Sequence, residues 1–366
     1  MKESLSDLYM IIYSVYIFLG IAFFLTFFDI TNISDEKKKC LFAFLCLWAI
    51  LIVTFREGIG FDYNAYIDIY NSTPPITEWK ERWQFLFSGR LTFVELAYLF
   101  INAVTKSIFD IYEIVFFVMA IISFYTYYKT IPRMTRYIFS TFLVYIATVF
   151  FYKEMGQIRH GVAMALVLYS IPFLMNSHEK KFIIYNTIAV LFHKAVLPIY
   201  ILFFFKNLKW KKGIAFGVLI ICIFLYNFDF SEFLLNYIGN ISIFADQTES
   251  IAKADVDGIV SIEKFIFPVM VAGLSIIFLD SGAKKFSYYH IELTMLLIGI
   301  GIMAIFHGYK EFGQRLSAAF MLSEILLLPQ VCIGIPKRLI GKIIGWLTIL
   351  ALCGIYIYHT LQTFPM

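Results

Sequence analysis

Long, nearly uninterrupted apolar runs are the feature that most limits what this chain can fold into. A helix needs about 20 mainly apolar residues to cross the hydrocarbon core of a bilayer. Runs that reach or approach this length lie at 8–30, 40–55, 111–128, 137–152, 161–175, 213–228, 265–279, 287–306, 316–334 and 339–358. A transmembrane β-barrel would instead show short segments of alternating polarity. We therefore predict an all-α polytopic integral membrane helical bundle with about 11–12 transmembrane segments.

The composition agrees with a chain surrounded by lipid. Hydrophobic residues make up 60% of the 366 residues and charged residues only 15%, whereas soluble globular proteins carry about 25% charged residues. The net charge of +4 is spread over many short loops and forms no basic cluster of the kind that binds nucleic acid. The five cysteines lie within or beside apolar runs and lack metal-ligand spacing. We expect the lipid bilayer as a partner, no nucleic acid, and no cofactor or metal.

Lysine and arginine distinguish the two sides of the membrane. They concentrate in short segments that the positive-inside rule assigns to the cytoplasm: 37–39, 129–136, 180–181, 206–212, 284–285 and 337–338. The less basic loops 56–90, 153–160, 229–264 and 307–315, together with both termini, should then face outward. The first apolar run is longer than the core of a signal peptide, and acidic residues dilute its basic start, so we interpret it as a retained helix. Without a Gly/Ser linker or a clear internal repeat, residues 1–366 are predicted to form a single polytopic membrane domain.

Two apolar segments do not fit this alternation of sides. The segment from Leu91 to Phe109 carries Glu95, Asn102 and Lys106, and we predict an interfacial or re-entrant helix there. The segment 182–205 must begin and end in the cytoplasm although it is only about one helix long. Two half-helices broken near His193 would satisfy the charge pattern, and Pro198 follows the break. Broken helices are tolerated inside membranes only where they line a cavity or pack against protein, so this segment is a candidate site.

The loop after the second apolar run combines several groups that could bind a saccharide. Arg56 could grip a phosphate or carboxylate, and Gly60 permits a tight backbone bend. Asp62 could accept a proton or a sugar hydroxyl, while Tyr63 and Tyr66 could stack on a sugar ring. The alternative interpretation is an ordinary interfacial turn within an aromatic belt.

Three further charged positions suggest function because ionisable residues in a membrane are costly. Arg159 lies at the start of an apolar run, where a cation does not complement the helix dipole, so we interpret it as an anion-binding group. Snorkelling to lipid headgroups is the alternative. His193 is either a structural histidine or a general base. Arg315 repeats the placement of Arg159, and two or three arginines converging on the outer face would form a clamp for a diphosphate.

Other familiar patterns are weak or missing. Asp255 and Asp257 have the Asp-x-Asp form that many sugar-nucleotide transferases use to hold a metal, but a solvated acidic loop is the preferred interpretation. Gly58 and Gly60 lack the third glycine and the strand-turn-helix context of a dinucleotide site. No phosphate-binding glycine loop, zinc set or nucleophile elbow occurs in the sequence.

Several short motifs follow one another in a fixed order along the chain, roughly from Phe55 to Pro329, and together they resemble the EpsG family, the Wzy-like polymerases of bacterial surface polysaccharides. The matching positions are the first external-loop motif at 56–66, Glu-x-x-Tyr at 95–98, Ile-Arg-Gln-x-x-Ala at 158–163, Phe-His-x-Ser/Ala at 192–195, and the late Arg-to-Pro helix from Arg315 to Pro329. His160 stands where the family usually has glutamine, and Lys194 follows His193. These departures concern the details of the polar pocket.

The resemblance implies a membrane glycosyltransferase that polymerises polyprenyl-diphosphate-linked oligosaccharide repeat units into an O-antigen, capsule or exopolysaccharide. The reaction would take place on the outer, periplasmic face of the bacterial inner membrane, with undecaprenyl diphosphate as the leaving group. A chain-length regulator and a flippase would be partners. The implied roles fall on the positions that match the family: Arg159 and Arg315 for the diphosphate with Arg56 as an additional contact, Asp62 or His193 as the base, and Gly60, Tyr63, Tyr66, Glu95 and His160 around the substrate.

Two other classes of membrane protein remain open from the residues alone. A transporter or flippase for a lipid-linked or anionic saccharide would use the same arginines, with the broken helix as a gate, although the inverted repeat of many transporters is missing. A different membrane transferase is the other class. An O-antigen ligase would usually carry arginine and histidine in its large external loop, yet 229–264 contains neither; a sugar O-acyltransferase would show an early histidine, yet none precedes His160.

Overall fold

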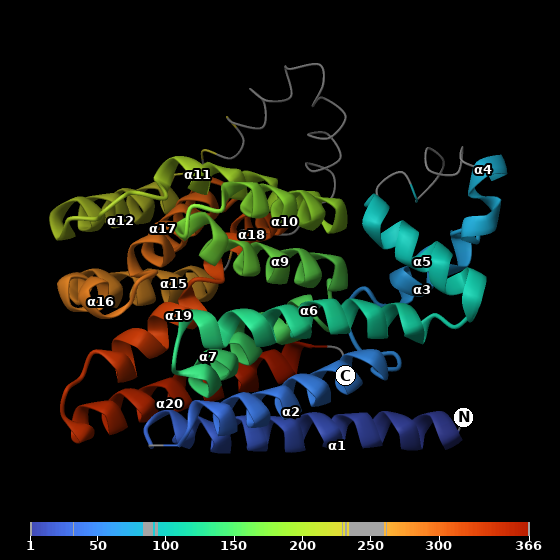
Figure 1. The fold of residues 1–366 in the computed structure, drawn as a ribbon, viewed down its shortest axis with the longest axis horizontal. Coiled ribbons are helices and arrows are strands. Elements are labelled where there is room, and N and C mark those ends of the chain that lie inside the picture. The colour runs from blue at the N-terminus through green and yellow to red at the C-terminus, as the bar shows by residue number, and fades with distance from the viewer. Residues whose placement is uncertain are drawn as a thin grey trace. The chain divides into compact units, whose positions relative to one another are not determined.

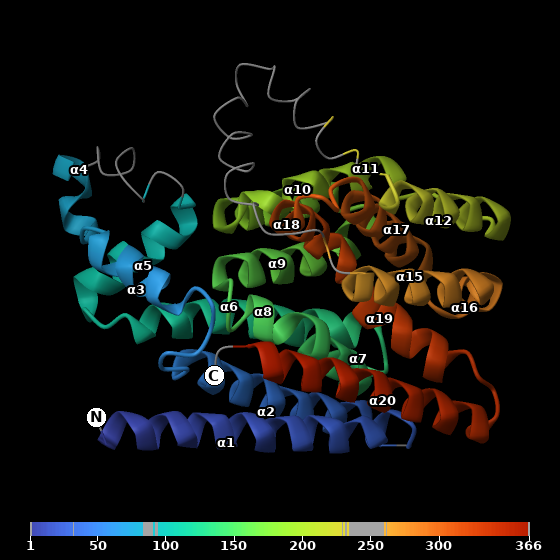
Figure 2. The same cartoon turned by 180° about the vertical axis from the view of Figure 1, so that it is seen from behind.

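The computed structural model describes residues 2–31, 33–82, 91, 94–228, 230, 233, 260 and 262–364. All regular secondary structure in these residues is helical, and Figures 1 and 2 show the helices from opposite sides. The predicted all-α polytopic fold is therefore confirmed. The chain divides into two compact units, Met1–Lys194 with Arg338–Met366, and Ala195–Lys337. The single domain predicted from the sequence stays a prediction, and each unit is described by itself.

The first unit contains most of the candidate residues. Its helices are α1 (Lys2–Leu25), the 3-10 turn η1 (Thr26–Asp29), α2 (Asp35–Thr54), α3 (Tyr63–Ser72), η2 (Ile76–Glu78), α4 (Trp79–Arg82), α5 (Leu96–Ile108), α6 (Glu113–Met134), α7 (Ile138–Tyr145), the π-helical turn η5 (Ile146–Phe150), α8 (Phe151–Lys153), α9 (Ile158–Met175), α10 (Glu179–Phe192) and α20 (Leu339–Thr363). Helix α2 packs against α1 and α6, and these three run side by side in both views (Figures 1 and 2).

Length and composition separate complete spans from shorter apolar helices. Four described helices are long and apolar enough to cross a membrane, or up to six if each of two bent pairs counts as one span. The four candidate spans are Tyr9–Asp29, Glu113–Met134, Ile158–Met175 and Leu339–Thr363. Further apolar helices of 10–17 residues include α5, α12 (Lys212–Tyr226) and α17 (Tyr289–Ile305). The predicted total of about 11–12 crossings and the side that each loop faces stay predictions.

Helix α9 forms the centre of the first unit. In its spanning window, 83% of the residues are buried, against 17% in α20. A helix that is apolar on all sides is stable when protein surrounds it, and α9 packs against α6 and α10. Asn186 of α10 strengthens the second contact by donating a hydrogen bond to Ser170 Oγ at 2.9 Å. These contacts hold α9, whose first turn carries Arg159, among its neighbouring helices.

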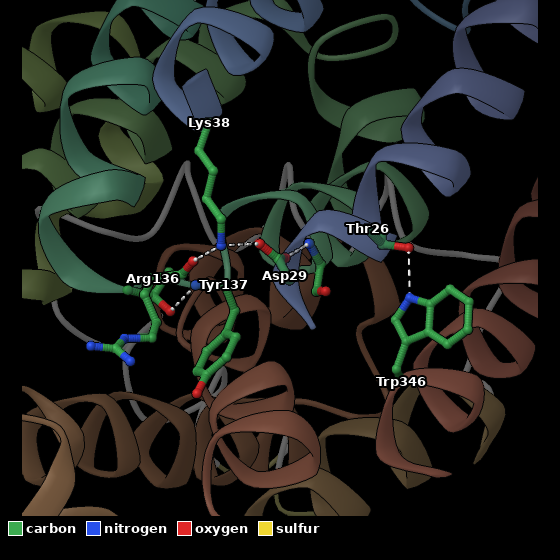
Figure 3. A network of polar contacts seen from close by, with 8 residues as sticks. Thr26, Asp29, Lys38, Arg136, Tyr137 and Trp346 are labelled. Atoms are coloured by element: carbon green, nitrogen blue, oxygen red, sulfur yellow. Dashed lines mark hydrogen bonds and ion pairs between the residues drawn. The ribbon is translucent and has the colours of Figure 1, made fainter. Parts of the chain in front are cut away.

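A buried polar network holds the C-terminal end of α1 against its neighbours (Figure 3). The Asp29 carboxylate accepts a hydrogen bond from Ser140 N at 2.7 Å and pairs with Lys38 Nζ at 3.4 Å. Lys38 also donates to the carbonyl of Arg136 at 3.3 Å. Trp346 of α20 donates to Thr26 Oγ1 at 2.8 Å. The network joins η1, α2, α20 and the start of α7, whose unpaired N–H groups Asp29 caps from outside the helix.

The predicted break in the segment 182–205 is confirmed. Helix α10 ends at Phe192, and His193 has an extended backbone with φ −158° and ψ 115°. A 3-10 helix, η6 (Lys194–Ile201), follows and contains Pro198, which cannot donate a backbone hydrogen bond. The short helix α11 (Leu202–Phe205) completes the segment. The break places His193 at the end of a helix instead of along its face.

The second unit is a separate group of helices. Besides α11 it contains α12 (Lys212–Tyr226), α15 (Ile262–Ile277), α16 (Leu279–Lys285), α17 (Tyr289–Ile305), α18 (Lys310–Met321), α19 (Glu324–Pro329) and the π-helical turn η7 (Gln330–Gly334). Helix α17 packs against α12, α15 and α18. Trp210 fixes the chain before α12, since its Nε1 donates to Thr294 Oγ1 at 2.9 Å. Most of the predicted external loop 229–264, with Asp255 and Asp257, lies outside the described residues.

Candidate functional site

The loop that follows α2 is a tight turn formed by two glycines. Gly58 and Gly60 have positive φ angles of 73° and 113°, a backbone conformation that other residues rarely adopt. At Gly60 there is also no space for a side chain, because a Cβ there would lie 2.1 Å from the carbonyl oxygen of Met155. Gly60 therefore brings this loop into direct contact with the turn that precedes α9.

Arg56 reinforces the same contact from inside the protein. Its side chain is fully buried, and its Nη1 donates to the carbonyl oxygens of Glu154, at 3.1 Å, and of Met155. The guanidinium also lies 4.6 Å from the ring centre of Phe116. Burial lowers the pKa of Arg56 to about 10, so the group stays charged at neutral pH. In this position Arg56 holds the loop, and a direct contact with substrate would require the loop to open.

Glu154 is a site residue that the sequence did not single out. Its side chain is buried, and its Oε1 accepts a hydrogen bond from the Tyr145 hydroxyl at 2.9 Å. The carboxylate lies directly over Gly161, where a Cβ would come within 2.8 Å of it. Desolvation raises the pKa of Glu154 to about 7. A single residue thus contacts Arg56 through its backbone and α9 through its side chain. In the sequence Glu154 is one of several polar residues in the predicted loop 153–160, so nothing there distinguishes it.

Glu95 joins three of the motifs in one polar cluster. It is the N-cap residue of α5, with φ −70° and ψ 144°, and its side chain forms an ion pair with Arg159 at the start of α9. The other carboxylate oxygen, Oε1, lies 3.6 Å from His193 Nδ1 and accepts a hydrogen bond from the backbone N–H of Lys194 at 3.3 Å. The three side chains remain 10–21% exposed. Groups more than 60 residues apart in the sequence therefore share one partly accessible site.

Aromatic rings and a second histidine surround this cluster. The guanidinium carbon of Arg159 lies 5.9 Å from the ring centre of Tyr66 and 5.8 Å from that of Tyr98, within the range of cation–π attraction. The rings of His160 and His193 are 4.4 Å apart. Lys153 Nζ lies 3.1 Å from His160 Nδ1. His160, at the position that resembles a family glutamine, therefore also makes a polar contact.

The remaining predicted residues lie beside this cluster or in the other unit. Asp62 is half-buried at the start of α3, one turn before Tyr66. The hydroxyl of Tyr63 lies 3.2 Å from that of Tyr112. Arg315 belongs to α18 of the second unit, where its half-exposed side chain pairs with Glu311 at 3.2 Å. Its convergence with Arg159 on one ligand stays a prediction.

The chemistry available at the cluster is charge stabilisation and proton transfer. Arg159 supplies a fixed cation, and Glu95 lies beside the His193 imidazole, whose unprotonated ring nitrogen can act as a base. Within the described residues, no group of three or more His, Cys, Asp or Glu side chains is arranged to hold a metal ion.

Comparison with known protein families gives one match. The model described as "EpsG family" matches residues 39–365, nearly the whole chain. Comparisons with curated proteins and with solved structures give no match.

Proposed function

The chain belongs to the EpsG family of Wzy-like polysaccharide polymerases, and from this premise we propose that it joins polyprenyl-diphosphate-linked oligosaccharide repeat units into a bacterial surface polysaccharide. The family match supports a membrane polysaccharide polymerase in general. The observation that supports the specific reaction is the cluster of Arg159, Glu95 and His193, in which an anion-binding cation lies beside a group able to act as a base.

The proposed reaction is a glycosyl transfer. A hydroxyl oxygen of the incoming repeat unit forms a bond to the anomeric carbon of the growing chain, while the bond from that carbon to the lipid diphosphate breaks. The leaving diphosphate carries concentrated negative charge, so a preorganised cation stabilises the transition state more than the ground state. Arg159 would supply this cation by exchanging part of its interaction with Glu95 for the phosphate oxygens.

A base must accept the proton of the attacking hydroxyl. His193 is the better placed candidate, because Glu95 orients its ring from 3.6 Å, and a carboxylate also stabilises the imidazolium that forms. Asp62 at the start of α3 is the alternative base. Arg56, in contrast, is proposed to act by position, because its buried guanidinium holds the glycine loop against the turn before α9.

The setting of the reaction is also proposed. We place the site on the outer face of the bacterial inner membrane, since the loops that carry it are less basic than those on the opposite side. Arg315 is proposed as a second contact of the diphosphate. A flippase that delivers repeat units and a regulator that sets chain length would be functional partners.

The proposal is tested in a strain that lacks the gene and is complemented with wild type, Arg159→Ala or Arg133→Ala. Arg133 is an exposed arginine at the end of α6 and is the matched control. We expect Arg159→Ala to abolish the polymer ladder while single repeat units still reach the surface and the protein inserts normally. Arg133→Ala should restore the ladder. Loss of every surface repeat unit in the deletion strain would instead indicate export, and an unchanged ladder would contradict polymerisation.

A further inference from the structure

A cavity of about 460 Å³ lies beside the glycine loop within the first unit. Helices α1 and α2 supply an apolar wall, and the loop and the start of α6 supply a polar end. Met10 and Leu51 belong to the wall, and Glu57, Tyr63, Tyr112 and Glu113 belong to the polar end. Met10 and Leu51 are 64% and 52% exposed, so in a membrane protein the wall continues onto a surface suited to contact lipid.

The polar end has the chemistry of a saccharide site. The carboxylates of Glu57 and Glu113 can accept hydrogen bonds from sugar hydroxyls, and charge-assisted hydrogen bonds of this kind are the strong ones. The hydroxyls of Tyr63 and Tyr112 lie 3.2 Å apart and can share further hydrogen bonds with a ligand. Trp48 and Phe55 also line the cavity, and aromatic side chains of this kind can pack against the C–H groups of a sugar.

Charge distinguishes this cavity from the proposed diphosphate site. Among the described residues that line it, two are acidic and none is basic. A diphosphate would be repelled by the two carboxylates, because like charges at short range destabilise each other. A neutral sugar with several hydroxyl groups meets no such penalty, and hydroxyl donors satisfy the carboxylates.

Helix α3 connects the cavity to the catalytic cluster. Tyr63 lines the cavity, and Tyr66, one helical turn further, flanks the guanidinium of Arg159. Both tyrosine rings pack on Phe116, at 5.7 and 6.4 Å between ring centres. One turn of helix rises about 5.4 Å, comparable to the length of a sugar residue. The same helix thus contributes one tyrosine to the cavity and one to the cluster around Arg159.

We propose that this cavity is a saccharide subsite that binds neutral sugar residues of the lipid-linked substrate. The inference rests on the proposed polymerase function and adds where the sugars bind. In this arrangement Arg159 holds the diphosphate, Glu57 and Glu113 hold sugar hydroxyls, and the isoprenoid chain lies along the exposed apolar surface of α1 and α2. The two carboxylates contribute binding and leave the chemical step to the cluster around Glu95.

The first test measures polymerisation by the purified protein in lipid nanodiscs as a function of the concentration of lipid-linked repeat unit. The variants are the double replacements Glu57→Ala/Glu113→Ala and Glu57→Gln/Glu113→Gln. Glu36→Gln, an exposed change in the first turn of α2, is the control. We expect KM to rise about 10-fold or more in the alanine variant, because charge-assisted hydrogen bonds to the sugar are lost. The glutamine variant should show a smaller rise, and kcat should change little in either. Unchanged KM values, or a fall in kcat alone, would overturn the subsite.

The second test separates this inference from the proposed function. Titration calorimetry measures binding of the lipid-free repeat-unit oligosaccharide, prepared by cleaving the exported polysaccharide, and of geranyl diphosphate as a probe for the lipid diphosphate. The subsite predicts that the alanine variant loses oligosaccharide affinity about 10-fold or more and keeps its affinity for geranyl diphosphate. The reverse pattern would overturn it. If wild type binds the oligosaccharide at this cavity but forms no polymer, the polymerase proposal fails and the subsite stands.

Discussion

The carboxylate of Glu95 holds three groups at once: the guanidinium of Arg159, the imidazole of His193 and the backbone N–H of Lys194. Such shared contacts fix the geometry of a site before substrate arrives, and preorganised charges are the largest contribution to many enzymatic rates. The side chains of Glu95, Arg159 and His193 could each be identified from a sequence motif. The sequence could not show that Glu95 is the residue that joins them, because contacts across more than 60 residues depend on the fold.

Glu154 makes the fold sensitive to pH. Burial raises its pKa from 4.5 to about 7, so the folded state holds a proton that the unfolded state has released. Its stabilising contribution is therefore complete below about pH 4.5 and is lost as the pH rises through about 7. We expect the ionisation of Glu154 to account for up to about 3 kcal/mol of the unfolding free energy lost over this interval, and Glu154→Gln to reduce the pH dependence by that amount. Thermal unfolding of wild type and this variant in detergent between pH 4.5 and 8.5 measures this pH dependence of stability.

The comparison for this prediction is Glu36→Gln, which changes an exposed carboxylate and should keep the wild-type pH profile. A Glu154→Gln variant with the same slope as wild type would show that another group is responsible. Glu154 could not be predicted from the sequence because its importance comes from Tyr145, Gly161 and the Arg56 contact, which only the fold brings together.

At the scale of elements, turns and helix ends place the site. The glycine loop after α2, the N-cap of α5, the start of α9 and the break after α10 each present one site residue at the end of an element. The break near His193 could be predicted because loop charges required two half-helices there. Lys106 is one of the polar residues that led us to predict an interfacial or re-entrant helix at α5. In the structure it donates hydrogen bonds to the carbonyls of Tyr70 and Asn71, a contact that the sequence does not show.

Gly60 is expected to tolerate substitution less well than Gly58. Both have positive φ, which costs another residue about 1–2 kcal/mol. A Cβ at Gly58 meets nothing within 4 Å, whereas one at Gly60 collides with the Met155 carbonyl. Gly58→Ala should therefore lose about 1–2 kcal/mol of unfolding free energy, and Gly60→Ala more, together with most polymer formation. Thermal unfolding and the polysaccharide ladder measure these effects, and equal losses in both variants would contradict the close contact.

Asp29, which lies just after the C-terminal end of α1, is expected to stabilise the folded protein. Replacing it by alanine leaves Lys38, which is only 6% exposed, without its counter-charge and removes the cap of α7 (Figure 3). Breaking a buried ion pair in this way costs about 3–5 kcal/mol. Asp35→Ala, at an exposed position of the first turn of α2, should cost much less. Unfolding midpoints of both variants in detergent decide this, and equal midpoints would contradict a stabilising network.

For the whole molecule, the apolar runs were sufficient to predict an all-α membrane fold, because few structures satisfy backbone hydrogen bonds in lipid. The division into two units could not be predicted from the runs, since packing between helices depends on side-chain shapes that periodicity does not report. Helices α1 and α20 are the least enclosed spans of the first unit, with 33% and 17% of their windows buried, and we expect them to face lipid.

The charge pattern predicts that both termini lie outside the cytoplasm. A C-terminal fusion to alkaline phosphatase, which is active only after export, should therefore be active, and a fusion to a fluorescent protein that folds only in the cytoplasm should be dark. Fusions truncated after the basic segment 129–136 should give the opposite result. A fluorescent full-length fusion would reverse the predicted orientation and place the candidate site on the cytoplasmic side.

Polymerisation by the purified protein tests the central claim most directly. Wild type and Arg159→Ala would be reconstituted in liposomes with lipid-linked repeat units, and the products separated by size. We predict a ladder of increasing chain length and release of polyprenyl diphosphate with wild type, and a loss of both by a factor of about 100 or more with Arg159→Ala. Polymer formation at equal rates by the two proteins would contradict the role of Arg159, and no polymer from correctly folded wild type would contradict the proposed function itself.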